Sequence, residues 1–163
     1  MKKILLLSDT HSLLDNFILK HTGDVDEIWH AGDLGDISIY DELKNITKVR
    51  MVYGNIDNKT IRAQIPLIQN FDIDGFKVIM THIGGYPGHY QSGMKEYLVQ
   101  EKPNLFISGH SHILKVIYDK KLQLLHMNPG AAGAHGFHQK RTMLKFSIEN
   151  GEIKDLVLIE KNK

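Results

Sequence analysis

Residues 4–11 read ILLLSDTH, a short aliphatic run that stops at side chains able to bind a metal ion. Four more apolar runs end in the same way: EIWHAGD at 27–33, VRMVYGNID at 49–57, KVIMTH at 77–82 and LFISGHSH at 105–112. Polar residues or glycine bound each run, which favours a buried strand over a helix. Because ligands of open α/β sheets bind beyond the carboxyl ends of the strands, we expect the five endings to converge.

The length and charge of the chain limit the kinds of protein it can be. A chain of 163 residues fits one domain over residues 1–163, large enough to bury roughly 70% of its unfolded surface. It has 20 Lys and Arg against 19 Asp and Glu, which argues against a nucleic acid polymer as partner. No run approaches the ~20 apolar residues of a membrane span, so we expect no membrane partner.

The N-terminal residues resemble the start of a secretion signal. The apolar stretch is interrupted at Ser8-Asp9, however, short of the roughly 7–15 residues that such a signal requires. We therefore interpret the start of the chain as a first strand and expect a cytoplasmic protein.

The chain contains no cysteine. This excludes disulfides, thiolate nucleophiles and zinc-thiolate sites, and it leaves His, Asp and Asn as the available metal ligands. Any metal site would therefore use nitrogen and oxygen donors.

The first part of the chain alternates between predicted strands and helices. Ser12 is suited to cap a helix over about 13–20 that stops at Thr22-Gly23, and a second helix is expected near 37–44. This alternation through Tyr53 predicts a parallel, right-handed βαβαβ unit.

The second part of the chain has a different pattern. Asp74-Gly75 and Asn150-Gly151 each separate two strand-like runs, which predicts type I′ hairpin turns and a mostly antiparallel arrangement. A helix is expected over about 92–100, before Pro103. Together the two parts predict an α/β protein, a four-layer α/β/β/α sandwich of two mixed sheets flanked by helices.

Five short motifs in this order resemble the calcineurin-like metallophosphoesterases. They are Asp9-x-His11, Gly32-Asp33, Gly54-Asn55-x-Asp57, Thr81-His82 and Gly109-His110-Ser111-His112. Within that superfamily the chain is most similar to compact bacterial and archaeal phosphodiesterases, whose eukaryotic relative is the Vps29 retromer subunit. The resemblance implies the metallo-dependent phosphatase fold.

The resemblance also implies a centre of two divalent ions. Its ligands would be Asp9, His11 and His112 at the first ion and Asn55, His82 and His110 at the second, with Asp33 bridging the two. Asp33, Asn55 and His82 would then be catalytic, and a hydroxide bridging the ions would attack phosphorus. We expect Mn²⁺, with Fe, Ni, Co or Zn as alternatives, since His and carboxylate ligands suit all of these metals.

The sequence departs from the family pattern at Ile56. In the larger enzymes of the superfamily a histidine follows the asparagine and can protonate the leaving oxygen, and Asp57 would orient it. Isoleucine cannot do this, and loss of a general acid removes about 10²–10⁴-fold in rate. We therefore predict phosphodiesterase activity above phosphomonoesterase activity, with a small phosphodiester as substrate and a structural role for Asp57.

Two further residues are candidate substrate contacts. His89 lies in the glycine-rich stretch 83–90 after His82 and could replace the missing acid, or it could be a solvated surface residue. Asn128 begins the turn Asn128-Pro129-Gly130 after a strand that ends at His126. This turn would lie near the site in the smaller family members, or it is simply a tight turn. His126, His135 and His138 could contact the ligands or the substrate, but a histidine on a strand or loop is more often simply hydrogen-bonded or solvated, and we predict no ligand role for any of them.

Two alternative functions remain. The chain could be a metal-binding scaffold that works by protein contact, as the resemblance to Vps29 implies, or a phosphomonoesterase. The predicted ligands of both ions are all present, which argues against a scaffold. Neither the natural substrate nor the oligomeric state follows from the sequence, and a homo-oligomer is an open alternative.

Overall fold

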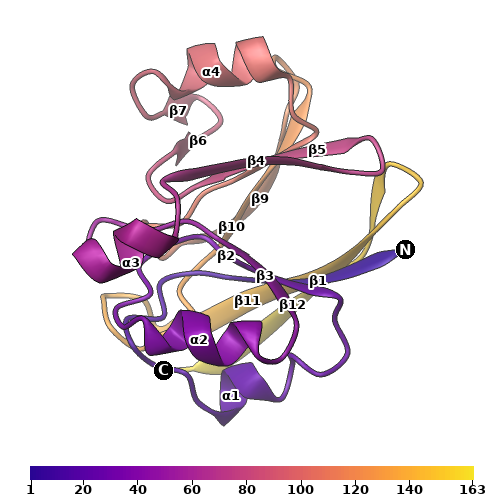
Figure 1. Ribbon diagram of the computed structural model, residues 1–163. Coiled ribbons are helices and arrows are strands. Elements are labelled where there is room, and N and C mark those ends of the chain that lie inside the picture. The colour runs from indigo at the N-terminus through magenta and orange to yellow at the C-terminus, as the bar shows by residue number, and fades with distance from the viewer.

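The computed structural model describes residues 1–163, and its first sheet has the strand order β12-β11-β1-β2-β3 (Figure 1). Strands β1 to β3 are parallel, as predicted, and the C-terminal hairpin pairs antiparallel with β1. The strands are β1 Lys2–Leu7, β2 Glu27–His30, β3 Lys48–Met51, β11 Lys140–Glu149 and β12 Glu152–Asn162. The last two elements of the chain therefore complete the sheet that the first element begins.

The second sheet has the order β4-β5-β8-β10-β9. Its strands are β4 Ile68–Ile73, β5 Phe76–Thr81, β8 Leu105–Ile107, β9 Leu114–Asp119 and β10 Leu124–Pro129. The prediction of a mostly antiparallel second part is wrong for the centre of this sheet, because β5, β8 and β10 run parallel. Only the two edge strands are antiparallel to their neighbours.

Both predicted hairpin turns are confirmed. Asp74 and Gly75 have φ of 51° and 85° between β4 and β5, and Asn150 and Gly151 have φ of 52° and 73° between β11 and β12. A type I′ turn needs positive φ at both central residues, which asparagine, aspartate and glycine tolerate best.

The two sheets pack face to face, and helices cover their outer faces (Figure 1). One apolar cluster, which includes Trp29, Met80 and Phe146, fills the space between the sheets. A second cluster packs α1 and α2 against the first sheet, and a third packs α4 against the second. Burial of each large apolar side chain contributes about 1.5–3 kcal/mol. The predicted four-layer α/β/β/α sandwich of two mixed sheets is therefore confirmed.

The helices are short, and one of them was not predicted. They are α1 Asn16–Leu19, α2 Ser38–Lys44, α3 Lys59–Gln64 and α4 Met94–Glu101. The helix expected over 13–20 is reduced to one turn. Ser12 does not cap it, because Ser12 has φ of 70° and its backbone N–H donates to Leu34 O at 2.7 Å. Asp15 occupies the N-cap position instead.

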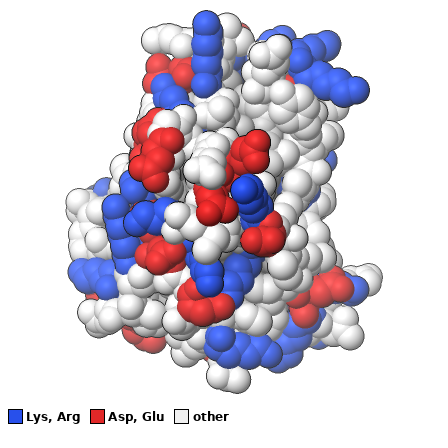
Figure 2. Space-filling view, turned by 90° about the vertical axis from the view of Figure 1, so that its right-hand side faces the viewer, with Lys and Arg blue, Asp and Glu red and all other residues white.

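The loop after β5 forms a small separate hairpin of β6 (Gly85–Tyr86) and β7 (His89–Tyr90). None of the helices is long and apolar enough to cross a membrane. On the face shown in Figure 2, acidic side chains lie among the lysines and arginines, so no continuous basic surface forms there.

Candidate metal centre

The predicted ligands lie in loops that follow β1, β2, β3, β5 and β8, where the two sheets meet. Backbone hydrogen bonds join these loops directly. The N–H of Asp9 donates to Gly32 O at 2.9 Å, that of His11 to Asp33 O at 3.1 Å, and that of Gly109 to His82 O at 3.0 Å. The third of these bonds joins the loops after β5 and β8, so the loops of each sheet are held together.

The first group of potential ligands is Asp9, His11 and His112, whose donor atoms lie within 4.8 Å of one another. Asp9 Oδ1 is 3.2 Å from His112 Nε2 and 4.0 Å from His11 Nε2. The other oxygen, Asp9 Oδ2, accepts from Ser8 Oγ and from the backbone N–H of His110. These bonds orient the carboxylate so that Oδ1 faces both imidazoles.

The second group is Asp33, His82 and His110. His82 Nε2 lies 3.2 Å from Asp33 Oδ2 and 3.1 Å from Asn55 Oδ1. His110 packs edge-on against His82, with 5.3 Å between ring centroids. The structure therefore brings together all seven predicted metal ligands.

Asp33 connects the two groups. Its Oδ2 is 3.5 Å from His11 Nε2 in the first group and 3.2 Å from His82 Nε2 in the second. A single carboxylate within reach of both ligand sets is what two closely spaced ions require.

The donor atoms of both groups fit divalent cations. Asp9 Oδ1 and His11 Nε2 are buried without any hydrogen-bond partner, an arrangement that costs about 1–3 kcal/mol per group unless a ligand satisfies them. His82 Nδ1 donates to Ala31 O at 2.7 Å, so neutral His82 presents a lone pair at Nε2. In the neutral form that lone pair faces the acceptor oxygens of Asp33 and Asn55, and either a proton on Nε2, as in the ion pair with Asp33, or a bound cation satisfies such a cluster of acceptors.

Three pKa values are shifted in this cluster. Burial lowers the pKa of His11, against the charges of Asp33 and Asp9. Burial is the largest single influence on the pKa of Asp33 and acts to raise it, but the hydrogen bond and charge of His82, the Ile56 N–H and the charge of His11 together outweigh burial, and the pKa falls. Burial acts to lower the pKa of His82, but the bond to Asp33 and the nearby carboxylates raise it. Neutral His11 and ionised Asp33 are the forms that bind metal.

The backbone at the centre is strained. Five predicted ligands have positive φ: 54° at Asp9, 44° at His11, 58° at Asp33, 71° at His110 and 61° at His112. Residues other than glycine rarely adopt this region, and when they do they cluster at functional sites.

Glycine is required at position 54 because of a close approach to Asp33. A Cβ on Gly54 would lie 2.1 Å from Asp33 Oδ1 and 2.5 Å from the Asp33 backbone nitrogen. Any larger residue would displace the carboxylate that connects the two groups of ligands.

Ile56 and Asp57 lie beside the second group. The Ile56 side chain is 45% exposed, and its backbone N–H donates to Asp33 Oδ1 at 3.1 Å. Asp57 is buried and accepts three backbone N–H bonds, from Leu34 at 3.2 Å, Gly35 at 2.9 Å and Gly54 at 2.8 Å. The predicted structural role of Asp57 is confirmed: it fastens the loop after β3 to the loop after β2.

The two groups open into a cleft of about 540 Å³, here called the main cleft. Its walls include the loop 135–138, for whose histidines the sequence analysis predicted no ligand role. The His135 ring stacks on His11 with centroids 4.7 Å apart, and His138 packs edge-on against His112 at 5.1 Å. Phe137 is fully exposed at the mouth of the cleft.

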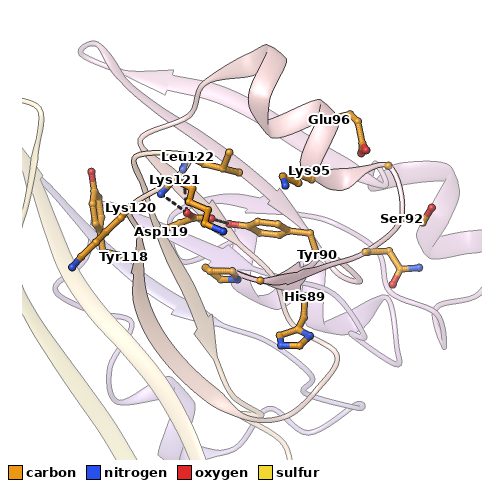
Figure 3. Close-up of a pocket in the computed structure, with 14 residues that line it drawn as sticks. His89, Tyr90, Ser92, Lys95, Glu96, Tyr118, Asp119, Lys120, Lys121 and Leu122 are labelled. Atoms are coloured by element: carbon orange, nitrogen blue, oxygen red, sulfur yellow. Dashed lines mark hydrogen bonds between the residues drawn. The ribbon is translucent and has the colours of Figure 1, made fainter.

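His89 is not brought to the predicted ligands. It is an exposed residue of β7 and lines a separate pocket of about 650 Å³ (Figure 3). In that pocket the Tyr90 hydroxyl donates to Asp119 Oδ2 at 2.6 Å, and burial together with this bond raises the pKa of Tyr90.

Asn128 is close to the centre, but its side chain is already engaged. Its amide nitrogen donates to Gly109 O at 3.0 Å and to Ser111 Oγ at 3.1 Å, and its oxygen accepts from the Gly130 N–H. The expected turn at 128–130 begins later than predicted, because Asn128 and Pro129 belong to β10. Asn128 therefore supports the loop that carries His110 and His112.

Comparisons with known proteins agree with this geometry. The family model of the calcineurin-like phosphoesterase superfamily domain matches residues 1–151. A probable metallophosphoesterase of Methanothermobacter thermautotrophicus is 29% identical over 133 residues, which are 77% of this chain and 74% of that relative.

Solved structures share the fold. An archaeal phosphodiesterase has a TM-score of 0.73 at 23% identity, covering 96% of this chain and 99% of the other. Wild-type Vps29 of Entamoeba histolytica, solved in complex with Zn²⁺, has a TM-score of 0.76 at 16% identity, covering 98% of both chains. At these identities the likeness establishes the metallo-dependent phosphatase fold and nothing finer.

Proposed function

The chain belongs to the calcineurin-like phosphoesterase superfamily, and on that premise we propose that it is a two-metal phosphodiesterase acting on small phosphodiesters. The observation that carries the proposal is the pair of adjacent ligand groups connected by Asp33, with two buried donor atoms that have no partner within the protein. A protein without a bound cation would have no physical reason to bury these atoms unpaired.

Each of the two groups of residues would bind one ion. Asp9, His11 and His112 would hold one ion, and His82, His110 and Asn55 the other, with Asp33 shared. When bound, the ions would supply Lewis acidity at the phosphoryl oxygens and would lower the pKa of a water molecule. We propose Mn²⁺ as the metal, because the donors are imidazole nitrogens and hard oxygens without a thiolate.

The residues of the chain hold and orient this centre. Ala31 O fixes the imidazole of His82 through Nδ1, so that Nε2 points toward Asp33 and Asn55. The Ile56 N–H holds Asp33 Oδ1, which leaves Oδ2 free to connect the groups. Bonds of this kind to metal ligands contribute substantially to metal affinity.

Substrate preference follows from Ile56. Its side chain borders the main cleft where it can neither donate a proton nor offset a second negative charge. Departure of a poor leaving group would then proceed without acid assistance, and a dianionic monoester would be held less well than a monoanionic diester. We therefore propose that diesters are cleaved in preference to monoesters.

The test is hydrolysis by metal-stripped protein reloaded with Mn²⁺, using a bis-aryl phosphodiester and the matching aryl monoester. We expect the diester to be cleaved faster, and we expect Asp33→Asn to abolish metal-dependent cleavage. Faster turnover of the monoester would contradict the proposed preference. If neither ester is cleaved by protein shown to contain both ions, the chain is not a phosphoesterase of this kind.

A scaffold function is the second candidate, because large apolar side chains are exposed beside the main cleft. Phe137 and Ile113 line the cleft and are 105% and 62% exposed. Exposed apolar side chains grouped beside a site are typical of a protein contact. Metal binding without hydrolysis of either ester would favour this alternative.

A further inference from the structure

A second, smaller pocket adjoins the metal centre. It has a volume of about 140 Å³ and shares His110 and Ser111 with the main cleft. Its other walls include Tyr86, Lys115 and His126. A group bound in this pocket would therefore lie next to a predicted metal ligand.

His126 lines this pocket and carries a buried, unpaired acceptor. The side chain is 1% exposed, and its Nδ1 donates to Phe106 O at 3.1 Å. The proton must lie on Nδ1, because a carbonyl oxygen can only accept. Nε2 is consequently a lone-pair acceptor, and it has no partner in the protein. A buried acceptor without a donor is costly, which points to a donor supplied from outside the chain.

The charge state of His126 agrees with this assignment. Burial lowers its pKa to about 4, opposed by the bond to Phe106 and helped by the charge of Lys115. The imidazole is therefore neutral at pH 7 and cannot itself donate from Nε2.

The remaining polar groups restrict what can bind. The Asn128 amide is engaged within the protein, and Ser111 Oγ accepts from Asn128 Nδ2 and from the Ile113 N–H. Gln91, at the exposed rim, is another uncharged polar side chain of the lining. The Lys115 ammonium lies 3.7 Å from the centre of the Tyr86 ring. A fixed cation here disfavours a second cation, such as an ammonium group, by charge repulsion. A deprotonated carboxylate or phosphate would be attracted to Lys115, but it has no proton to donate to His126 Nε2. The preferred occupant is therefore a neutral group that carries a hydroxyl donor.

The volume limits the size of that group. A water molecule occupies about 30 Å³ in the liquid, so a pocket of 140 Å³ has the room of four to five waters. This admits a three-carbon alcohol but falls well short of the roughly 300 Å³ at which drug-sized ligand pockets begin. A nucleoside would have to lie in the main cleft instead.

We propose that this smaller pocket binds one ester group of an asymmetric phosphodiester. The group is small, neutral and hydroxyl-bearing, such as a glyceryl group, and the hydroxyl of the bound group donates to His126 Nε2. The inference deepens the proposed function and rests on it for the position of phosphorus at the metal centre. The second ester group lies in the main cleft. Hydrolysis adds one water across a P–O bond and releases one alcohol and one phosphomonoester.

The first test compares aryl glyceryl phosphate with aryl propyl phosphate in the Mn²⁺-loaded protein. The two esters differ only in hydroxyl groups, and one buried hydrogen bond corresponds to a preference of about tenfold in kcat/KM. His126→Phe keeps a buried ring but removes the acceptor, so we expect the preference to be lost. His21→Phe is the control, since His21 lies two residues after α1 and lines neither this pocket nor the main cleft, and it should keep the preference.

The second test measures binding without turnover. Titration calorimetry with glycerol 3-phosphate and propyl phosphate should show about tenfold tighter binding of the former to the metal-loaded protein, and an ethanolamine ester should bind less well than either. Equal binding of the glyceryl and propyl compounds by the natural protein would overturn the inference, since water alone would then satisfy His126. Tighter binding of glycerol 3-phosphate without hydrolysis of any diester would reject the proposed phosphodiesterase activity but would support the proposed binding pocket.

Discussion

Replacement of Asp57 by asparagine tests how the loops of the metal centre are held. The carboxylate accepts three backbone N–H bonds and is buried, with Oδ2 bonded to Leu34 and Gly54 and Oδ1 to Gly35. Asparagine has the same shape, but one of its two terminal atoms is a donor. Its oxygen can retain the two bonds at Oδ2, and its NH₂ group then faces the N–H of Gly35.

The expected loss of stability follows from these contacts. A hydrogen bond to a charged group contributes about 1.5–3 kcal/mol, and Asp57→Asn removes one and leaves two without charge assistance. We expect the free energy of unfolding to fall by about 3 kcal/mol, equivalent to about 6–12 °C in Tm for a chain of this size. Affinity for Mn²⁺ should fall as well, because the affected loops carry Asp33 and Asn55.

The assay is urea unfolding of the metal-free protein, so that bound ions do not mask the change. Asp155→Asn is the control: Asp155 is exposed, has φ of 55°, and makes no side-chain contact that asparagine would lose. It should change the free energy of unfolding by less than about 0.5 kcal/mol. A similarly small change in Asp57→Asn would show that the three bonds do not hold the loops as argued.

Three further predictions concern the same region and its support. Ile56→His places an imidazole at the edge of the main cleft, and we expect the monoester-to-diester rate ratio to rise by about tenfold or more; an unchanged ratio would separate the preference from the missing acid. Gly54→Ala brings a Cβ to 2.1 Å from Asp33 Oδ1, so Mn²⁺ binding measured by calorimetry should weaken by at least about tenfold, and unaltered affinity would contradict this. The third concerns Asp15, which pairs with the buried Arg141 through two bonds of 2.8 Å, and these hold the pKa of Asp15 below its usual value of about 3.9. Because the folded pKa is lowered, the stabilisation is complete above the usual pKa and is lost as the pH falls through the folded value. In urea unfolding, Asp15→Asn should therefore lower the free energy of unfolding by about 1 kcal/mol at pH 7, allowing for solvent screening, and by less below about pH 4. A difference in unfolding free energy that does not change with pH would refute the assignment.

The strand ends were predictable because local sequence determines them. A buried strand must be apolar, and the first polar residue after it marks where the chain leaves the sheet, so Asp9, Asp33 and His82 are visible from sequence alone. The turns at Asp74-Gly75 and Asn150-Gly151 were equally visible, since their positive φ restricts the residues allowed.

Other features depend on contacts between distant parts of the chain. Serine is a common helix N-cap residue, but the backbone N–H of Ser12 donates to Leu34 O, and no local sequence pattern reveals that hydrogen bond. The parallel pairing of β8 and β10 brings residues about twenty positions apart together without a helical signature between them. Helix α3 is short, and its cap at Asn58, which accepts from the Ile61 N–H, was the one local signal available.

The position of the loop 135–138 also depends on contacts between distant parts of the chain. His135 and His138 have no regular spacing from the ligands, and they approach His11 and His112 only because the chain folds over the cleft after β10. The Nε2 atom of His126 likewise became noteworthy only once its burial and missing partner were visible.

The residues proposed to hold each ion come from both sheets. In the first group, Asp9 and His11 follow β1 of the first sheet, whereas His112 follows β8 of the second sheet. In the second group, Asp33 and Asn55 come from the first sheet, and His82 and His110 come from the second. A bound ion would therefore cross-link two layers that are otherwise joined mainly by non-directional apolar contact. The ions would hold the two sheets together at one edge of the sandwich, so a force that pulls the sheets apart would meet its greatest resistance there. Without the ions, the sheets would separate from that edge first.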